Sequence, residues 1–307
     1  MSPPNRLNKI VKAFQIKIDG QYFDYRNGQV LELTEIKNFF EGKGYQIIKF
    51  IPQERHVNAV LNRNLFLKLS TSKGISIVTE NEATWNEAVS IFLSVPKNYE
   101  RGYYINNYFY LITNYFNGKM FNNKIVKDNI DAIIDLSEKI MSLKIPLLPS
   151  DNYNFGKNHQ EKFANKVESH FEAIPKEVKQ KYSLEKLLIL TKSGIPNLGA
   201  MPRHGDFAPW HMILSSNGEI NLIDGEHAMS QGVEYYDIGY FIQRVFSVWK
   251  EKDLAKKIYE RLISRGYEKN KLKTILLARA IGGFLDESLS PSPNYLIHEE
   301  FKDWVLS

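Results

Sequence analysis

The sequence predicts an α+β fold with two unequal lobes, a small strand-rich lobe followed by a larger helical one. Over about the first 115 residues, short segments alternate apolar and polar side chains, as strands with one buried face do. After Asn117-Gly118 the apolar side chains recur at the three- and four-residue spacing of helices. We therefore place the lobe boundary at this turn, with residues 1–116 in the first lobe and 117–307 in the second.

The first lobe is expected to begin with a hairpin, because two alternating segments flank Asp19-Gly20, a dipeptide typical of tight hairpin turns. The sequence does not indicate what this hairpin, residues 13–25, does. A second helix is expected from Thr79 to about Ser94, since Thr79 and Glu82 have the spacing of a capping box. The expected elements are the strands Ala13–Ile18, Gln21–Tyr25, Tyr45–Ile51, Val57–Leu61, Leu65–Leu69, Tyr103–Ile105 and Phe109–Tyr115, and a helix Leu33–Phe40 capped by Thr34.

The second lobe is predicted to be helical apart from one short hairpin around Ser216-Asn217-Gly218. That hairpin joins Met212–Leu214 to Ile220–Ile223. The expected helices are Asn129–Leu143, His159–Ile174, Glu177–Leu190, Tyr235–Val248, Asp253–Arg265, Leu272–Leu285 and Tyr295–Val305.

Composition excludes several classes of protein. The 307 residues contain no cysteine, so a disulfide framework, a thiolate zinc site and a cysteine nucleophile are all excluded. The excess of 40 Lys and Arg over 35 Asp and Glu is small, and the lysines are scattered among acidic residues, which argues against a nucleic-acid surface. The longest apolar stretch, Ile275–Leu285, is too short to span a bilayer, and Met1–Asn8 is polar. We expect a cytoplasmic protein without a membrane span.

The segment with the strongest chemical pattern is His204-Gly205-Asp206-Phe207-Ala208-Pro209-Trp210-His211. It precedes the short hairpin, whose second strand ends in Leu222-Ile223-Asp224-Gly225-Glu226. Asp206 before the hairpin and Asp224 at its exit are therefore expected to lie close together. Two such carboxylates can hold a hard cation and orient a hydroxyl group.

These two segments resemble the motifs of the aminoglycoside phosphotransferase/choline kinase-like family, which has a protein-kinase-like fold. The family's loop reads H-G-D-x-x-x-x-N, and its second motif is an aspartate at the end of an apolar strand. The resemblance implies that Asp206 is the catalytic base and that Asp224 binds the Mg²⁺ on the nucleotide phosphates. It also implies structural support by His204. Glu226 is implied either to bind a second metal or to support Asp224.

The flanking segments extend the resemblance over about residues 45–285. Lys68 lies mid-strand among apolar residues and matches the family's phosphate-binding lysine. Glu87 on the following helix is the expected carboxylate partner of Lys68, with Glu80 and Glu82 as competitors. Asp237 in Tyr235-Tyr236-Asp237-Ile238-Gly239 matches the aspartate that braces the catalytic loop.

One residue departs from the family's pattern, because His211 stands where the metal-binding asparagine is expected. Imidazole suits Mn²⁺ better than Mg²⁺. Three outcomes stay open: a single metal held mainly by Asp224, a preference for Mn²⁺, or nucleotide binding without turnover. The loop Pro52-Gln53-Glu54-Arg55 has no glycine, which argues against a protein kinase and leaves Gln53 or Arg55 as nucleotide contacts.

We expect an ATP- or GTP-dependent phosphotransferase that acts on a hydroxyl group of a small molecule. The main alternative is a nucleotide-binding protein impaired in catalysis. A metal-dependent hydrolase using His204, Asp206, His211, Asp224 and His227 is a weaker alternative, as is a nucleic-acid binder.

The acceptor and the oligomeric state do not follow from the sequence, and aminoglycosides, amino alcohols, sugars and nucleosides all stay open as acceptors. A cationic acceptor needs an acidic cleft, and a choline-like or sugar acceptor needs aromatic walls. The candidates are the acidic residues Glu226, Glu234, Asp286, Glu287, Glu299 and Glu300, and the aromatic residues Trp210, Tyr235, Tyr236, Tyr240 and Trp249.

Overall fold

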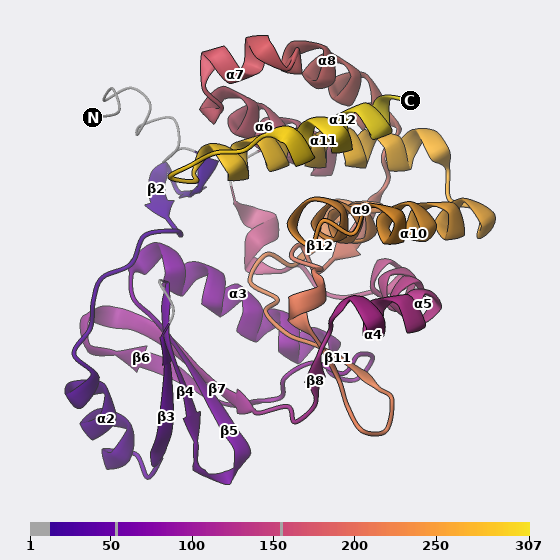
Figure 1. The fold of residues 1–307 in the computed structure, drawn as a ribbon. Coiled ribbons are helices and arrows are strands. Elements are labelled where there is room, and N and C mark those ends of the chain that lie inside the picture. The colour runs from indigo at the N-terminus through magenta and orange to yellow at the C-terminus, as the bar shows by residue number, and fades with distance from the viewer. Residues whose placement is uncertain (1–12, 53–54, 154–155) are drawn as a thin grey trace.

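A computed structural model describes residues 13–52, 55–153 and 156–307, and it has the predicted strand-rich and helical parts (Figure 1). Gln53, one of the two expected nucleotide contacts, lies outside the described residues, as does Met1–Asn8. None of the helices in the described part of the chain combines the length and apolar character that crossing a membrane requires.

The strand-rich part contains a five-stranded antiparallel sheet in the order β3-β4-β5-β7-β6. Alternation along β5 explains how the sheet divides its side chains. Leu67 and Leu69 are buried in a cluster with Ile36 and Phe40 of α2, whereas Lys68 points to the opposite face, toward α3. The elements of this part are β1 (Gln15–Ile18), β2 (Gln21–Asp24), α2 (Leu33–Gly42), β3 (Ile47–Pro52), β4 (His56–Leu61), β5 (Leu65–Ser70), α3 (Lys73–Val89), β6 (Asn98–Tyr104) and β7 (Tyr108–Asn114).

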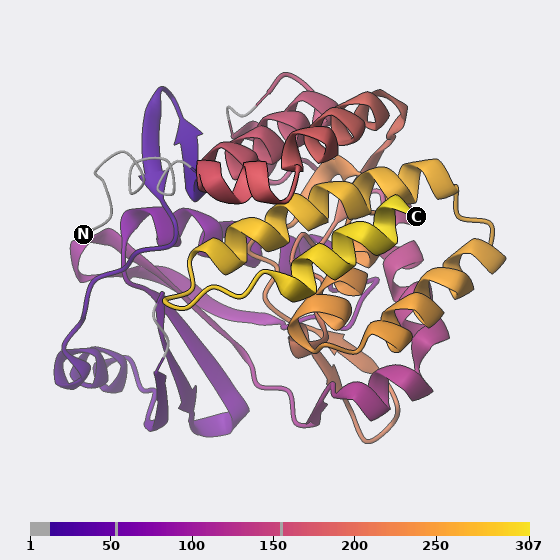
Figure 2. The same cartoon turned by 45° about the horizontal axis from the view of Figure 1, so that its top comes forward.

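The predicted N-terminal hairpin forms, with β1 and β2 paired around a turn in which Asp19 and Gly20 both have positive φ, as a type I′ turn requires. The hairpin does not join the five-stranded sheet. It stands beside the first turns of α3 on one side and beside α6 (His159–Ala173) on the other (Figure 2).

Helix α3 begins six residues earlier than predicted. Its N-cap is Ser72, whose hydroxyl accepts a hydrogen bond from the Ile75 amide, so the capping-box interpretation of Thr79 is wrong. Thr79 is buried in the helix interior, and its hydroxyl donates to the Ile75 carbonyl one turn back. The expected Thr34 cap is also wrong, since α2 begins at Leu33 after Glu32.

The helical part packs around a larger apolar cluster, which also includes Trp85 and Val89 from the end of α3. The expected helix 177–190 is interrupted at Ser183, which has φ +51°. Three short strands, β8, β9 and β12, were not predicted. The elements are β8 (Lys119–Met120), α4 (Asn123–Asp128), α5 (Ile130–Ser142), α6, α7 (Lys176–Lys181), α8 (Leu184–Gly194), β9 (Ala200–Arg203), β10 (Met212–Leu214), β11 (Ile220–Leu222), β12 (Met229–Val233), α9 (Tyr236–Gln243), a π-helical turn (Arg244–Val248), α10 (Lys252–Ser264), α11 (Lys269–Ser288) and α12 (Leu296–Leu306).

Strand β7 ends at Asn114, and the next strand, β8, pairs with β10 of the helical part. The change of partner falls at residues 115–118, which agrees with where the sequence changes character. The division into residues 1–116 and 117–307 stays a prediction about domains.

Candidate active site

Lys68 lies at the centre of a cluster of carboxylates between the two parts of the molecule. Its ammonium nitrogen lies 2.6 Å from Glu82 Oε2, 2.5 Å from Asp224 Oδ1 and 2.6 Å from Glu226 Oε1. Burial opposes the charged form of Lys68, but Asp224, Glu226 and Glu82 outweigh burial and raise its pKa well above the usual value. One buried cation therefore balances part of the charge of three carboxylates.

The partner of Lys68 on α3 is Glu82, and the expectation that Glu87 fills this role is wrong. Glu87 lies more than one helical turn further along α3 and pairs with Arg101 at 3.2 Å on the surface. The error follows from the helix start. Because α3 begins at Lys73, Glu82 falls at its middle, opposite Lys68, and not at a cap. Burial raises the pKa of Glu82 although Lys68 opposes this.

Lys68 contacts both Asp224 and Glu226, so support of Asp224 and binding of a second metal both stay predictions for Glu226. Besides Lys68, its carboxylate binds Arg55 Nη2 at 2.6 Å and lies 3.1 Å from His56 Nε2. The Asn81 side chain on α3 donates to the Glu226 carbonyl, so the backbone here is tied to the same helix. Arg55, one of the two expected nucleotide contacts, is held by Glu226 in this arrangement.

The loop that carries Asp206 is held by backbone contacts. The carboxylate of Asp237 accepts hydrogen bonds from the amides of His204 at 2.7 Å and Gly205 at 2.9 Å, which is the bracing geometry expected of it. Gly205 has φ +85°, and a Cβ atom at this position would lie 2.1 Å from the His227 carbonyl oxygen, so only glycine fits. Burial raises the pKa of Asp237 to about 6.

His204 is buried below this loop and faces Trp85 edge-on with ring centroids 6.1 Å apart. Burial lowers its pKa to about 4, so it is neutral at pH 7. Its side chain does not line the cavity described below. Neither of its ring nitrogens has a hydrogen-bond partner within the described chain, so the structural role of His204 stays a prediction.

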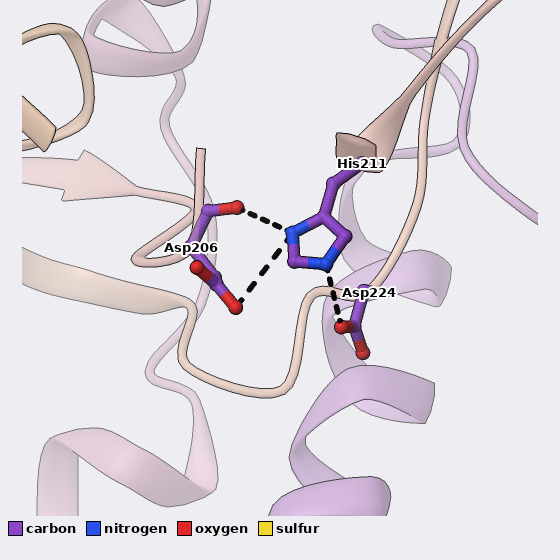
Figure 3. A group of neighbouring side chains, drawn as sticks. All are labelled: Asp206, His211 and Asp224. Carbon is purple, nitrogen blue, oxygen red and sulfur yellow. Dashed lines mark hydrogen bonds and ion pairs between the residues drawn. The ribbon is translucent and has the colours of Figure 1, made fainter. Parts of the chain in front are cut away.

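His211 connects the two aspartates of the motif (Figure 3). Its Nδ1 lies 2.8 Å from the Asp206 carbonyl oxygen and 3.6 Å from Asp206 Oδ2, and its Nε2 lies 3.1 Å from Asp224 Oδ2. Burial opposes protonation, but Asp206 and Asp224 outweigh it and raise the pKa of His211. His211 therefore bridges the two carboxylates in the place where a metal ion is expected.

Asp224 follows β11 with φ +68°, and this turn points its carboxylate back toward Lys68 and His211. The next residue, Gly225, packs against Trp85, where a Cβ atom would lie 2.4 Å from Cδ1. Burial opposes ionisation of Asp224, yet Lys68 holds its pKa well below the usual range. Its side chain is 28% exposed, so a ligand can reach it.

Among the described residues, two groups of side chains have ligand atoms close enough to share one metal ion. Atoms of Asp206, His211 and Asp224 all lie within 4.8 Å of one another, and the same holds for Glu82, Asp224 and Glu226. Asp224 belongs to both groups. Carboxylate oxygens suit Mg²⁺, and the imidazole of His211 adds a ligand that suits Mn²⁺.

A cavity of about 350 Å³ extends from Asp206 away from Lys68. Its walls come from the N-terminal hairpin, α6, β9, α9, α11 and the segment after Asp224, including Tyr25, Phe163, Tyr236 and Tyr240. The hairpin is held at this rim because Lys166 of α6 donates to the Ala13 carbonyl at 2.8 Å and to the Tyr25 hydroxyl at 2.9 Å. The hairpin therefore forms part of the wall facing Asp206.

The sequence indicated some of these residues and not others. Tyr236 and Tyr240 were two of the aromatic residues that the sequence offered as walls of an acceptor pocket, and both line the cavity. Tyr235, from the same set, packs instead against Tyr267 with ring centroids 4.7 Å apart. Arg203 and Arg279 were not singled out. The four-residue spacing of Tyr236, Tyr240 and Arg244 on one helix face is a signal that could have found part of this wall.

Comparison with known proteins identifies the fold. The described geometry matches a thermostable mutant of aminoglycoside phosphotransferase APH(4)-Ia in complex with ADP and hygromycin B, with a TM-score of 0.67 and 12% identity over 89% of this chain and 98% of that one. It also matches APH(3'')-Id from Streptomyces rimosus ATCC10970 with ADP and streptomycin, with a TM-score of 0.60 and 12% identity over 83% and 99% of the chains. A GDP complex of aminoglycoside 2'-phosphotransferase-IIIa matches with a TM-score of 0.58 and 10% identity over 89% and 94%.

No protein-family model matches the sequence, and no curated protein matches it. At these identities the solved structures show the fold alone. The chain has the protein-kinase-like fold of the aminoglycoside phosphotransferases, and the predicted fold class is confirmed.

Proposed function

We propose that this protein is an ATP- or GTP-dependent phosphotransferase that phosphorylates a hydroxyl group of a small molecule. The observation that carries the proposal is one continuous set of contacts from Glu82 through Lys68, Asp224 and His211 to Asp206. It places a buried lysine, a partly exposed carboxylate and a loop carboxylate in a row between the two parts of a phosphotransferase fold.

Each residue has a role in this reaction. Lys68 binds the nucleotide phosphates, and Glu82 holds Lys68 in place. Asp206 accepts the proton of the acceptor hydroxyl. At the same time the hydroxyl oxygen of the acceptor bonds to the terminal phosphorus of the nucleotide, and the nucleoside diphosphate leaves. Asp224, with His211 or Glu226, would hold Mg²⁺ or Mn²⁺, which neutralises phosphate charge when bound.

The test is a transfer assay with ATP or GTP, with Mg²⁺ or Mn²⁺, against a panel of hydroxyl compounds. We expect phosphorylated product from the wild type and a rate lower by about 10²–10⁴-fold in Asp206→Asn, since that is what a general base contributes. Nucleotide affinity should be retained, because Asp206 lies beyond the Lys68 cluster. Asp253→Asn, on the exposed surface of α10, is the matched control.

A second candidate function is nucleotide binding without turnover. It is favoured by His211, because its Nε2 lies 3.1 Å from Asp224 Oδ2 and would compete with a metal ion for that oxygen. Calorimetric binding of ATP together with an absence of transfer under every condition of the assay would support this candidate and reject the enzyme.

A further inference from the structure

The cavity next to Asp206 is lined by more cationic than anionic side chains. Among its described lining residues, seven are Arg or Lys and three are Asp or Glu. The three carboxylates belong to Asp206, Glu226 and Asp286. A compound that enters this cavity therefore meets an excess of positive charge in the same cavity as the proposed base.

The carboxylates that a cationic acceptor would need are already in use. Glu226 binds Arg55 at 2.6 Å, and Asp286 binds Arg244 at 2.7 Å. The third, Asp206, lies against His211. Other acidic candidates from the sequence pair elsewhere, with Glu234 on Lys271 and Glu300 on Lys252.

Two of the cations, by contrast, form no ion pair with a carboxylate among the described residues, although the charge of Arg203 opposes the rise that burial causes in the pKa of Asp237. The Arg203 guanidinium lies 4.0 Å from the ring centroid of Tyr236, and that of Arg279 lies 4.4 Å from the ring centroid of Tyr240. The Nε atom of each is buried without a hydrogen-bond partner within the described chain. Arg203 makes one weak contact, from Nη2 to the Met229 sulfur at 3.0 Å.

Arg279 is the better-defined of the two, because it is only 5% exposed and projects from the middle of α11. A Cβ atom on Gly282 would lie 3.2 Å from its Nη1, so the glycine leaves room for the guanidinium. A buried guanidinium without an anion is costly. It is also a planar donor that matches a carboxylate or a phosphate group.

The neighbouring titratable groups indicate the same positive potential. Burial lowers the pKa of His170 well below its usual value, and Lys166, Arg279 and Arg244 lower it further. Burial and Arg55 likewise lower the pKa of His227, although Glu226 opposes this. The hydroxyl of Tyr240 accepts a hydrogen bond from Arg244 Nη2 at 2.8 Å. Burial raises the pKa of the same tyrosine, and the charge of the nearby Asp206 raises it further.

We infer that the acceptor is anionic: a small hydroxyl compound that carries a phosphate or carboxylate group bound by Arg203 and Arg279, with its hydroxyl at Asp206. This inference rests on the proposed function, because it names the acceptor class of that reaction. Lys162 and Lys166 of α6 add charge to the same wall, and Tyr236 and Tyr240 supply its aromatic surface. Polycationic aminoglycosides do not fit this charge.

The experiment compares matched compounds that differ by one anionic group. Glycerol, ribose, glucose and uridine are each tested beside an anionic form: glycerol 3-phosphate and glycerate, ribose 5-phosphate, glucose 6-phosphate and glucuronate, and uridine monophosphate. Glucosamine, choline and kanamycin form the cationic arm. Binding is measured by calorimetry, and transfer from ATP or GTP is measured by phosphorus NMR of the product. The carboxylate and phosphate forms of glycerol and glucose distinguish the two anionic groups.

We expect at least one anionic compound to bind about 10-fold or more tightly than its neutral partner and to be phosphorylated. Arg279→Lys and Arg203→Lys keep the charge but lose the planar pair of donors, so each should weaken this binding by about 10-fold. Binding of the neutral partner should not change. Arg261→Lys, which alters a surface arginine paired with Asp131, is the matched control.

The outcomes separate this inference from the proposed function. Transfer only to neutral or cationic compounds would overturn the anionic acceptor and leave the phosphotransferase in place. Equal binding of every anionic compound and its neutral partner would overturn the inference as well. Anion binding that depends on Arg203 and Arg279, without transfer to any compound, would support the site and reject the proposed reaction.

Discussion

The two sides of Asp206 have opposite charge. On the Lys68 side, one lysine is surrounded by the three carboxylates of Glu82, Asp224 and Glu226. On the cavity side, seven Arg and Lys residues outnumber three carboxylates among the described lining residues. Glu226 belongs to both sides, since it contacts Lys68 and Arg55.

This difference indicates what each side lacks. The carboxylate-rich side is balanced by adding a cation, which fits a divalent metal that arrives with nucleotide phosphates. The cation-rich side is balanced by adding an anion, which fits a charged acceptor. The separation of charge across Asp206 is the basis on which we infer two different ligands.

The largest effect is expected from removing the only cation in contact with all three carboxylates in the described structure. Lys68→Met leaves Glu82, Asp224 and Glu226 buried together, and we expect it to lower the free energy of unfolding by about 3–5 kcal/mol. Urea unfolding measures this. Mn²⁺ or Mg²⁺ should stabilise the variant more than the wild type, because a metal then replaces the lost charge. An unchanged urea midpoint in metal-free buffer would show that the cluster carries little energy.

A smaller effect separates the two glutamates of α3. Glu82→Gln should lower phosphoryl transfer by about 10–100-fold, because a charge-assisted contact worth about 1.5–3 kcal/mol to Lys68 is weakened. Glu87→Gln is the matched variant on the same helix and should stay within about 2-fold, since Glu87 pairs with Arg101 and Asn98 and not with Lys68. Steady-state rates at saturating nucleotide measure both. Equal losses in the two variants would contradict the pairing of Lys68 with Glu82.

Metal preference should change by a few-fold when His211 is replaced. His211→Asn supplies an oxygen ligand next to Asp224, and oxygen ligands favour Mg²⁺. We expect the ratio of the Mg²⁺-supported rate to the Mn²⁺-supported rate to rise by about 3–10-fold, consistent with a modest difference in ligand preference. The ratio within each protein serves as its own control. A constant ratio would mean that His211 does not bind the metal.

The smallest effect concerns the hairpin on the cavity side. Lys166→Met removes the two hydrogen bonds that fix Ala13 and Tyr25, each worth about 0.5–1.5 kcal/mol. We expect KM for the acceptor to rise by several-fold while kcat changes little, because Lys166 lies away from the Lys68 cluster. Lys139→Met on α5 is a suitable control. A fall in kcat at constant KM would place the hairpin in the chemical step instead.

Much of the fold follows from the sequence because its signals are local. Alternation along Leu65–Leu69 and the Asp19-Gly20 turn each report a conformation within a few residues, and the structure contains both elements. The strands β9 and β12 have no such signal. They pair with each other across an intervening segment of the chain, as Arg203 does with Met229, so only tertiary contacts define them.

The candidate site shows the same division. The motif around Asp206 and Asp224 was visible because its residues lie close together in the sequence, and the fold brings the two aspartates onto His211. The partner of Lys68 depended on where α3 begins, so an error of six residues selected Glu87. Arg279 lies in an apolar stretch of sequence that gives no indication of an arginine facing a cavity.

Helix α3 has a consequence for how the two ligands affect each other. Its first turn lies against the hairpin, where Gly74 packs on the Asp24 carbonyl, its middle carries Glu82, and its end buries Trp85 under Gly225. A rigid helix cannot shift at one of these points and stay fixed at the others. If an acceptor moves the hairpin, Glu82 moves with it. Any factor by which the acceptor then changes the affinity for the nucleotide must equal the factor by which the nucleotide changes the affinity for the acceptor.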